Sequence, residues 1–394
     1  MNIWEKGIFF FSCLLDGMIV PVMSRIYLEH GASIENLAIF ITIYSITVII
    51  LEVPSGMMAD VLGRKKIFIL SHIALMAYYI TTLFSNSAVM LAFANLFHGV
   101  GRAFGSGSLE ALLIDKAIEK EGEDNLKRIN SQLIVLNSIA LAVGAILGGI
   151  LGTVGTGYNV LLTCIIVMEI VLLIISGIVI KEKWNRKTDR SLNENFSNQL
   201  RLIGKTMKTS DLIRIMLFMS ITLAMNLTLV EVYWQQKLLH ILPENMGWFF
   251  GVVSCMGYVG LSLGSKIGEY ISKKIDVEKI FWIFRVLLPC VIICLGQSFN
   301  WWMFLVIYIM TYIVWGIGDL QEGTIFHRHV ENEYRASMLS VKSLFVKGGC
   351  AVTSLFSSVI IHSSGLSYVW IVIPVITLLM TFVCSKVRYN THIR

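Results

Sequence analysis

The chain has 394 residues, of which 56% are hydrophobic and 15% are charged, and its mean hydropathy is +0.73. A typical soluble domain carries about 25% charged residues, so the composition excludes a water-soluble globular protein. The apolar residues lie in runs of roughly 20 residues along the whole chain, the length that a helix needs to cross a bilayer. The sequence therefore predicts a multi-pass, all-α integral membrane protein.

Twelve segments of spanning length can be distinguished in chain order. The first six are residues 7–29, 34–58, 66–86, 89–113, 130–153 and 158–180. The second six are residues 212–238, 247–271, 279–298, 301–323, 338–362 and 366–386. The long polar stretch between them predicts an N-terminal six-helix half (1–180), a cytoplasmic linker (181–211) and a C-terminal six-helix half (212–394).

Positive charge is concentrated at every second connection between the segments. These basic clusters are residues 64–66, 116–128, 181–214, 273–279, 328–347 and 386–394. Most of the alternate connections contain no Lys or Arg. The positive-inside rule then places the basic connections and both termini in the cytoplasm, which predicts a protein of the cell membrane. The net charge of +6 indicates this orientation and contact with anionic lipid, rather than binding to nucleic acid.

A tight cytoplasmic turn between the second and third segments carries the sequence GMMADVLGRKKIF. Gly56 allows close approach of helices, Gly63 permits the turn, and the cations that begin with Arg64 and Lys65 anchor the inner face. Asp60 is unexpected, because the positive-inside rule does not account for a carboxylate in a basic turn. These five residues are the candidate gate.

The turn resembles the signature of the major facilitator superfamily, G-x-x-x-D-[RK]-x-G-[RK]-[RK]. Val61 replaces the usual base after the Asp. The layout of twelve helices with a central linker extends the resemblance to the whole chain, and it implies two six-helix bundles related by a pseudo-two-fold axis. In that family the turn's Asp docks against the end of the eleventh helix, here near Ser337, and locks the outward-open state. A merely solvated turn is the alternative.

Charged residues inside the predicted spans are the strongest functional signal, because they are costly in hydrocarbon and face a cavity or a partner. Asp16, Arg102 and Glu231 lie in the first, fourth and seventh segments, and Asp319 and Glu322 lie near the inner end of the tenth. These four segments correspond to the helices that line the central cavity in the family resembled. Two further acids fall outside that set, Glu52 and Glu169. Glu52 could belong to the cytoplasmic gate, and Glu169 could pair with a polar group inside the bundle or tune its packing.

Arg102 begins a stretch, Arg102-Ala-Phe-Gly105, that resembles the R-x-x-x-G motif of the fourth helix in exporters of this family. The resemblance implies a part in proton transfer. Since an arginine stays charged, it acts by changing the proton affinity of a nearby acid, for which Asp16 and Glu110 are the candidates. The alternative is a static buried pair that orients helices.

The fifth segment contains a stretch similar to the family's antiporter signature, G-P-x-x-G-G. Gly144, Gly148 and Gly149 match, and Ala145 stands in place of the proline. The similarity implies export. Close helix packing through small residues is the alternative explanation.

Aromatic residues accompany the charges of the seventh and tenth segments. The candidate substrate-binding residues are Tyr233, Trp234, Gln235, Tyr308, Tyr312 and Trp315. The last three lie at i, i+4 and i+7, on one face of a helix. Aromatic walls with acids suit bulky lipophilic compounds, often cationic, although ordinary packing or an interfacial belt would give the same pattern.

Together these features predict a major facilitator transporter, a proton-coupled antiporter for efflux of drug-like or amphipathic molecules, as in multidrug resistance. The partners expected are a small-molecule substrate, protons and the lipid bilayer, and the chain is expected to act as a monomer. No phosphate-binding loop, metal cluster or nucleophile–base set is recognisable, so neither an enzyme nor a cofactor or metal is predicted. An importer or uniporter of a nutrient or metabolite and a non-transporting receptor are the alternatives.

Overall fold

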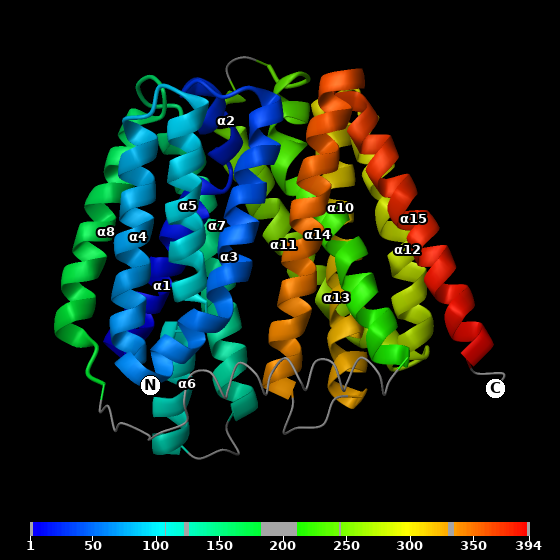
Figure 1. Cartoon of the computed structure of the whole chain (residues 1–394), viewed down its shortest axis with the longest axis horizontal. Helices are drawn as coiled ribbons and strands as arrows, with labels where there is room; N and C mark the ends of the chain where they lie inside the picture. Colours follow the sequence, from blue (N-terminus) through cyan, green and yellow to red (C-terminus); the bar gives the residue numbers. More distant parts are fainter. Residues whose placement is uncertain are drawn as a thin grey trace. The chain divides into compact units, whose positions relative to one another are not determined.

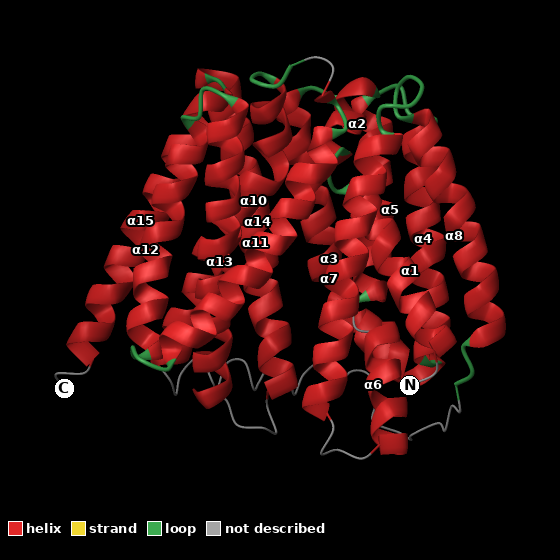
Figure 2. Ribbon diagram, turned by 180° about the vertical axis from the view of Figure 1, so that it is seen from behind, coloured by secondary structure: helices red, strands yellow, loops and turns green. Residues whose placement is uncertain are grey.

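The computed structural model describes residues 3–106, 108–121, 126–182, 211–243, 246–329 and 335–391. In this part of the chain the long regular elements are all helices (Figure 2). They are α1 (Ile3–Ile19), α2 (Met23–Glu29), α3 (Ile34–Leu62), α4 (Arg64–Leu83), α5 (Ala88–Gly105), α6 (Ser108–Glu121), α7 (Leu126–Leu151), α8 (Asn159–Val179), α10 (Asp211–Leu239), α11 (Phe249–Ser272), α12 (Val277–Gly296), α13 (Trp301–His329), α14 (Arg335–Ser364) and α15 (Leu366–Thr391). The linker predicted at 181–211 lies almost wholly outside the described residues.

Each of the twelve predicted segments corresponds to one helix or to a broken pair. The first is divided into α1 and α2, which are bent by 52°, and the fourth is divided into α5 and α6 at Ser106. Ten of the described helices are long and apolar enough to span a membrane, or eleven if α1 and α2 form one span. The mean hydropathy of α5 is reduced by Asn95, His98 and Arg102. The prediction of a multi-pass helical membrane protein is confirmed.

The chain forms two compact units. Unit 1 comprises residues 1–33, 46–189 and 243–256, and unit 2 comprises residues 34–45, 190–242 and 257–394. In unit 1, α1 packs on α7 and α8, and α4 packs on α5 and α8 (Figure 1). In unit 2, α10 packs on α14 and α15, and α12 packs on α13 and α15.

Glycines bring α1 and α7 into backbone contact within unit 1. A Cβ atom built on Gly17 would lie 2.6 Å from the carbonyl oxygen of Leu141. Cβ atoms on Gly144 and Gly148 would collide with the carbonyl oxygens of Leu14 and Met18. Close packing therefore accounts for the spacing of these two glycines, and they need no separate role in export.

Gly148→Ala is expected to destabilise the protein by about 1–3 kcal/mol, because the added methyl group must push α1 and α7 apart. The matched control is Gly7→Ala in α1, where an added Cβ meets no atom within 4 Å. That change should be neutral or stabilising by up to about 1 kcal/mol. Equilibrium unfolding of both purified variants in lipid–detergent micelles measures the difference. Equal stability of the two variants would contradict the packing.

Unit 2 contains a cluster of three charged side chains and one hydroxyl group, contributed by four helices. The wholly buried carboxylate of Glu322 in α13 forms ion pairs with Arg285 of α12 and, at 3.0 Å, with Lys342 of α14. Ser220 of α10 donates a hydrogen bond of 2.7 Å to the same carboxylate. The cluster joins α10, α12, α13 and α14 at one point.

Lys342 and Lys347 were counted in the basic cluster at 328–347, and they also fall within the predicted span 338–362. Lys342 and Lys347 lie inside α14, within the candidate span Val341–Ser364. Both have partners there: Lys342 pairs with Glu322, and the ammonium group of Lys347 lies 4.9 Å from the centre of the Tyr44 ring. Lysines can enter a span when such partners offset the cost of desolvation.

Candidate functional site

Asp16, near the end of α1, and Arg102, in the last turn of α5, form an ion pair within unit 1. Oδ2 of Asp16 in α1 lies 3.7 Å from Nη1 of Arg102 in α5, and the two side chains are 38% and 59% exposed. Charged groups are costly against lipid, so we expect these two exposed charges to face a cavity or a polar partner. Of the two acids considered for Arg102, the structure pairs Asp16 with it.

Glu110 lies close to the same pair. It is an exposed residue of the first turn of α6. Asp16, Arg102 and Glu110 all act electrostatically on Cys13, which lies one turn before Asp16 in α1. Three of the four predicted coupling residues are therefore neighbours in unit 1, while Glu231 belongs to unit 2.

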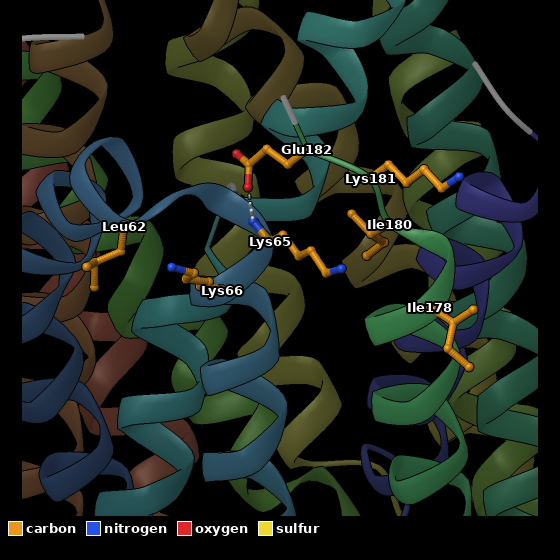
Figure 3. A pocket seen from close by; sticks show the side chains of 7 residues that line it. All are labelled: Leu62, Lys65, Lys66, Ile178, Ile180, Lys181 and Glu182. Atoms are coloured by element: carbon orange, nitrogen blue, oxygen red, sulfur yellow. Dashed lines mark hydrogen bonds between the residues drawn. The ribbon is translucent and has the colours of Figure 1, made fainter. Parts of the chain in front are cut away.

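The turn predicted as the gate is fixed by two acids that follow it in the chain. Gly63 has a φ of 95°, a left-handed conformation that favours glycine, and it separates α3 from α4. The backbone amide of Arg64 donates a 2.9 Å hydrogen bond to one carboxylate oxygen of Glu182. The backbone amide of Lys65 donates a 3.0 Å hydrogen bond to the other oxygen (Figure 3). Nη1 of Arg64 donates a 2.6 Å hydrogen bond to Asp115 at the end of the fourth predicted segment. Glu182 thus supplies a negative charge where the helix dipole of α4 favours one.

A pocket of about 350 Å³ lies beside this turn. Its lining residues are Leu62, Lys65, Lys66, Ile178, Ile180, Lys181 and Glu182 (Figure 3). The side chain of Lys65 donates a 2.7 Å hydrogen bond to the carbonyl oxygen of Gly177, which connects the start of α4 to the end of α8. A Cβ atom built on Gly56 in α3 would meet no atom of another element within 4 Å, so no close helix approach is seen at this residue. The Asp60 side chain lies outside the described part of the chain. The docking expected of Asp60 stays a prediction.

Four of the six predicted substrate residues form a continuous aromatic ladder in unit 2. The Trp234 and Tyr308 ring centres are 5.3 Å apart, those of Tyr308 and Tyr312 are 4.8 Å apart, and those of Tyr312 and Trp315 are 5.4 Å apart. The Tyr308 hydroxyl donates a 3.1 Å hydrogen bond to Tyr312. Gly257 of α11 also packs against the ladder, because a Cβ atom built on this glycine would lie 3.1 Å from the Tyr308 ring. The ladder is packed between α10, α11 and α13.

The remaining residues of this set lie around α10. Tyr233 and Gln235 are each 1% exposed, and they point in different directions from Trp234 because consecutive helical residues do not share a face. Glu231 is exposed and within electrostatic range of Tyr308 and Tyr312. It also acts, with Lys347, on Cys350 of α14. Unit 2 therefore has an acid and a base of its own near the ladder.

Lys347, Asp115 and Glu182 are residues of interest that sequence reasoning missed. Lys347 was grouped with a basic loop, although it follows the start of an apolar segment. Asp115 ends the stretch SLEALLID, and Glu182 is the first acid after the sixth segment. Acids close to other cytoplasmic connections were a signal that the basic turn has acidic partners. The sequence does not specify which acid pairs with which cation.

The helices long and apolar enough to span a membrane define a multi-pass membrane protein. The family model described as Major Facilitator Superfamily matches residues 7–319. The chain belongs to the major facilitator superfamily, and it is an MFS transporter.

Two solved structures with the same fold are those of the nucleoside transporter NupG and of a mutant of it. The mutant is similar with a TM-score of 0.82 at 11% identity, over 98% of this chain and 98% of that chain. The other has a TM-score of 0.79 at 13% identity, over 98% and 99%. At this identity the likeness establishes the fold alone. No curated protein sequence matches the chain.

Proposed function

We propose that the chain is a proton-coupled secondary transporter in which Asp16 binds the coupling proton. The observation that carries this proposal is the exposed pair of Asp16 and Arg102 within apolar helices. A positive neighbour favours the ionised carboxylate, and protonation of the carboxylate cancels the attraction. Proton binding therefore changes the free energy of one arrangement of α1 and α5 relative to another, which is what a conformational cycle requires.

For the substrate we propose amphipathic, drug-like molecules that are exported in exchange for protons. The aromatic ladder from Trp234 to Trp315 and the nearby Glu231 would suit an apolar ring system with a positive charge. In this proposal the turn at Gly63 is the gate, both termini are cytoplasmic, the membrane is the plasma membrane, and a single chain is the transporting unit.

Transport of a nucleoside or a similar polar compound is the second candidate, and Gln236 of α10 favours it. Its side chain is 2% exposed, and neither amide atom has a hydrogen-bond partner within the described ranges. A buried amide without a partner is costly, and it can bind the edge of a heteroaromatic base through one donor and one acceptor. The NupG structures, titled as those of a nucleoside transporter, share the fold.

Proteoliposomes with an imposed pH gradient test both candidates. A panel of lipophilic cations, neutral drugs, nucleosides and sugars is added in turn, while proton flux and substrate movement are recorded. Proton flux provoked by a lipophilic cation supports antiport, and cotransport of a nucleoside with protons supports the second candidate. Substrate equilibration without any proton flux would overturn proton coupling.

A further inference from the structure

A buried histidine–glutamate pair lies within unit 1, away from the Asp16–Arg102 ion pair. Nδ1 of His72 in α4 lies 2.9 Å from Oε2 of Glu169 in α8, and the two side chains are 4% and 1% exposed. On the other edge of the imidazole ring, Nε2 lies 3.2 Å from the hydroxyl of Ser12 in α1. Three helices therefore meet at this one ring.

The surroundings of the pair are mostly apolar. The Phe68 ring packs against the imidazole edge to face, with centres 4.5 Å apart. The second carboxylate oxygen of Glu169 is buried and has no hydrogen-bond partner within the described ranges. The titratable groups in electrostatic range of Glu169 are Asp16 of α1 and the buried Tyr79 of α4. Arg102 of α5 forms the ion pair with Asp16 and so partly offsets the negative charge that Asp16 presents to Glu169.

This geometry accommodates two protonation states without the loss of a hydrogen bond. When His72 is neutral, Nδ1–H donates to Glu169, and Nε2 accepts from the Ser12 hydroxyl. When His72 is an imidazolium, Nδ1–H still donates to Glu169, and Nε2–H donates to the Ser12 oxygen. The two states differ by one proton on Nε2, by reversal of the Ser12 hydroxyl, and by a change in net charge of the pair from −1 to 0.

We infer that His72 and Glu169 form a second proton-binding site of the transporter, and that its proton enters and leaves at Nε2 through Ser12. The inference rests on the proposed proton coupling and extends it from one carboxylate to a chain of groups. Ser12 lies one helical turn before Asp16 on α1, so the water that reaches Asp16 lies close to the outer end of this chain. Glu169 is then a positioning residue that stabilises the imidazolium, and His72 is the proton carrier.

A static ion pair that merely holds α1, α4 and α8 together is the competing explanation. Such a pair would need a permanent positive charge, for which arginine or lysine is suited, whereas histidine changes its charge between about pH 5 and 8. A static pair would use the Ser12 hydroxyl in one direction only, whereas proton exchange at Nε2 requires a group that can act as either donor or acceptor. The two explanations differ in whether His72 changes its protonation state in the folded protein.

NMR of the full chain in lipid nanodiscs, labelled with ¹⁵N in its histidine rings, tests the inference directly. We expect one imidazole, absent from the spectrum of His72→Gln, to lose the proton on Nε2 as the pH rises from about 5 to 8. In Glu169→Gln the same ring should remain neutral throughout this range. A His72 ring that keeps one protonation state in the wild-type protein would overturn the inference, whatever the transport assay gives.

Ser12→Ala is a milder variant that keeps both titrating groups. Because Nε2 loses its hydrogen-bond partner on the path of the proton, gradient-driven transport should be several-fold slower. Tyr78→Phe is the matched control, since it removes the buried 2.8 Å hydrogen bond between Tyr27 and Tyr78 and leaves the proton chain intact. A Ser12→Ala variant that transports as fast as this control would overturn the role of the pair in coupling. Failure of wild-type transport to respond to a pH gradient would overturn the proposed function, and the NMR result would still decide the site.

Discussion

Glu322→Gln is expected to destabilise the protein by about 3–5 kcal/mol. Glutamine keeps the shape of the side chain and an oxygen that can accept from Ser220 and Lys342, so the change isolates the loss of charge. Arg285, whose side chain is 4% exposed, is left with an uncompensated charge in the interior. Asp319 acts electrostatically on both Arg285 and Lys342, but it is exposed and cannot replace a buried partner. Equilibrium unfolding in lipid–detergent micelles, followed by tryptophan fluorescence, measures the effect.

Glu269→Gln provides the matched control for this prediction. Glu269 is also paired with a lysine, Lys273, at 3.4 Å, but the two side chains are 69% and 68% exposed. An exposed pair of this kind contributes about 0–1 kcal/mol, so the control should unfold almost as the wild-type protein does. In the double variant Glu322→Gln/Arg285→Met, part of the lost stability should return because the unpaired charge is gone. A loss no larger than that of Glu269→Gln would show that water reaches the cluster.

The fold was predictable because each spanning helix is an apolar segment of characteristic length in the sequence. A bilayer imposes a length and a hydropathy on every span, so the twelve segments could be distinguished without any knowledge of their packing. The breaks were not predictable in this way. Pro21 lies between α1 and α2, and the stretch Gly105-Ser106-Gly107-Ser108 lies at the break between α5 and α6, but such residues also occur in unbroken spans.

The site was only partly predictable, because pairing depends on three-dimensional contacts. The cost of charge in hydrocarbon identified Asp16, Arg102 and Glu169 as residues that need partners, but it could not choose between Asp16 and Glu110 for Arg102. His72 carries no formal charge in the sequence count, and its role becomes visible only where α4 packs on α8. Lys342 fell both within the predicted span 338–362 and within the basic cluster at 328–347, because a lysine near a segment end gives the same pattern whether it faces water or Glu322.

Asp16→Asn is expected to reduce gradient-driven transport to the level of protein-free liposomes. Asparagine has nearly the shape of aspartate but cannot bind the coupling proton, so the pH gradient can no longer drive the cycle. Exchange of labelled for unlabelled substrate without a gradient should continue, because it requires no net proton movement. Both quantities are measured in the same proteoliposome preparation, with the substrate identified by the panel. Asp276→Asn is the control, because asparagine caps a helix as well as aspartate does, and Asp276 caps α12.

Asp16→Asn is expected to leave the stability of the protein almost unchanged, because the ion pair that it removes is exposed. The Asp16 and Arg102 side chains are 38% and 59% exposed at a separation of 3.7 Å, so water compensates each charge when the other is removed. The pair then contributes about 0–1 kcal/mol to stability, in contrast to the buried cluster around Glu322. The double variant Asp16→Asn/Arg102→Gln should consequently remain folded and exchange substrate, with no response to the gradient. Undiminished gradient-driven transport by Asp16→Asn would remove Asp16 from the mechanism.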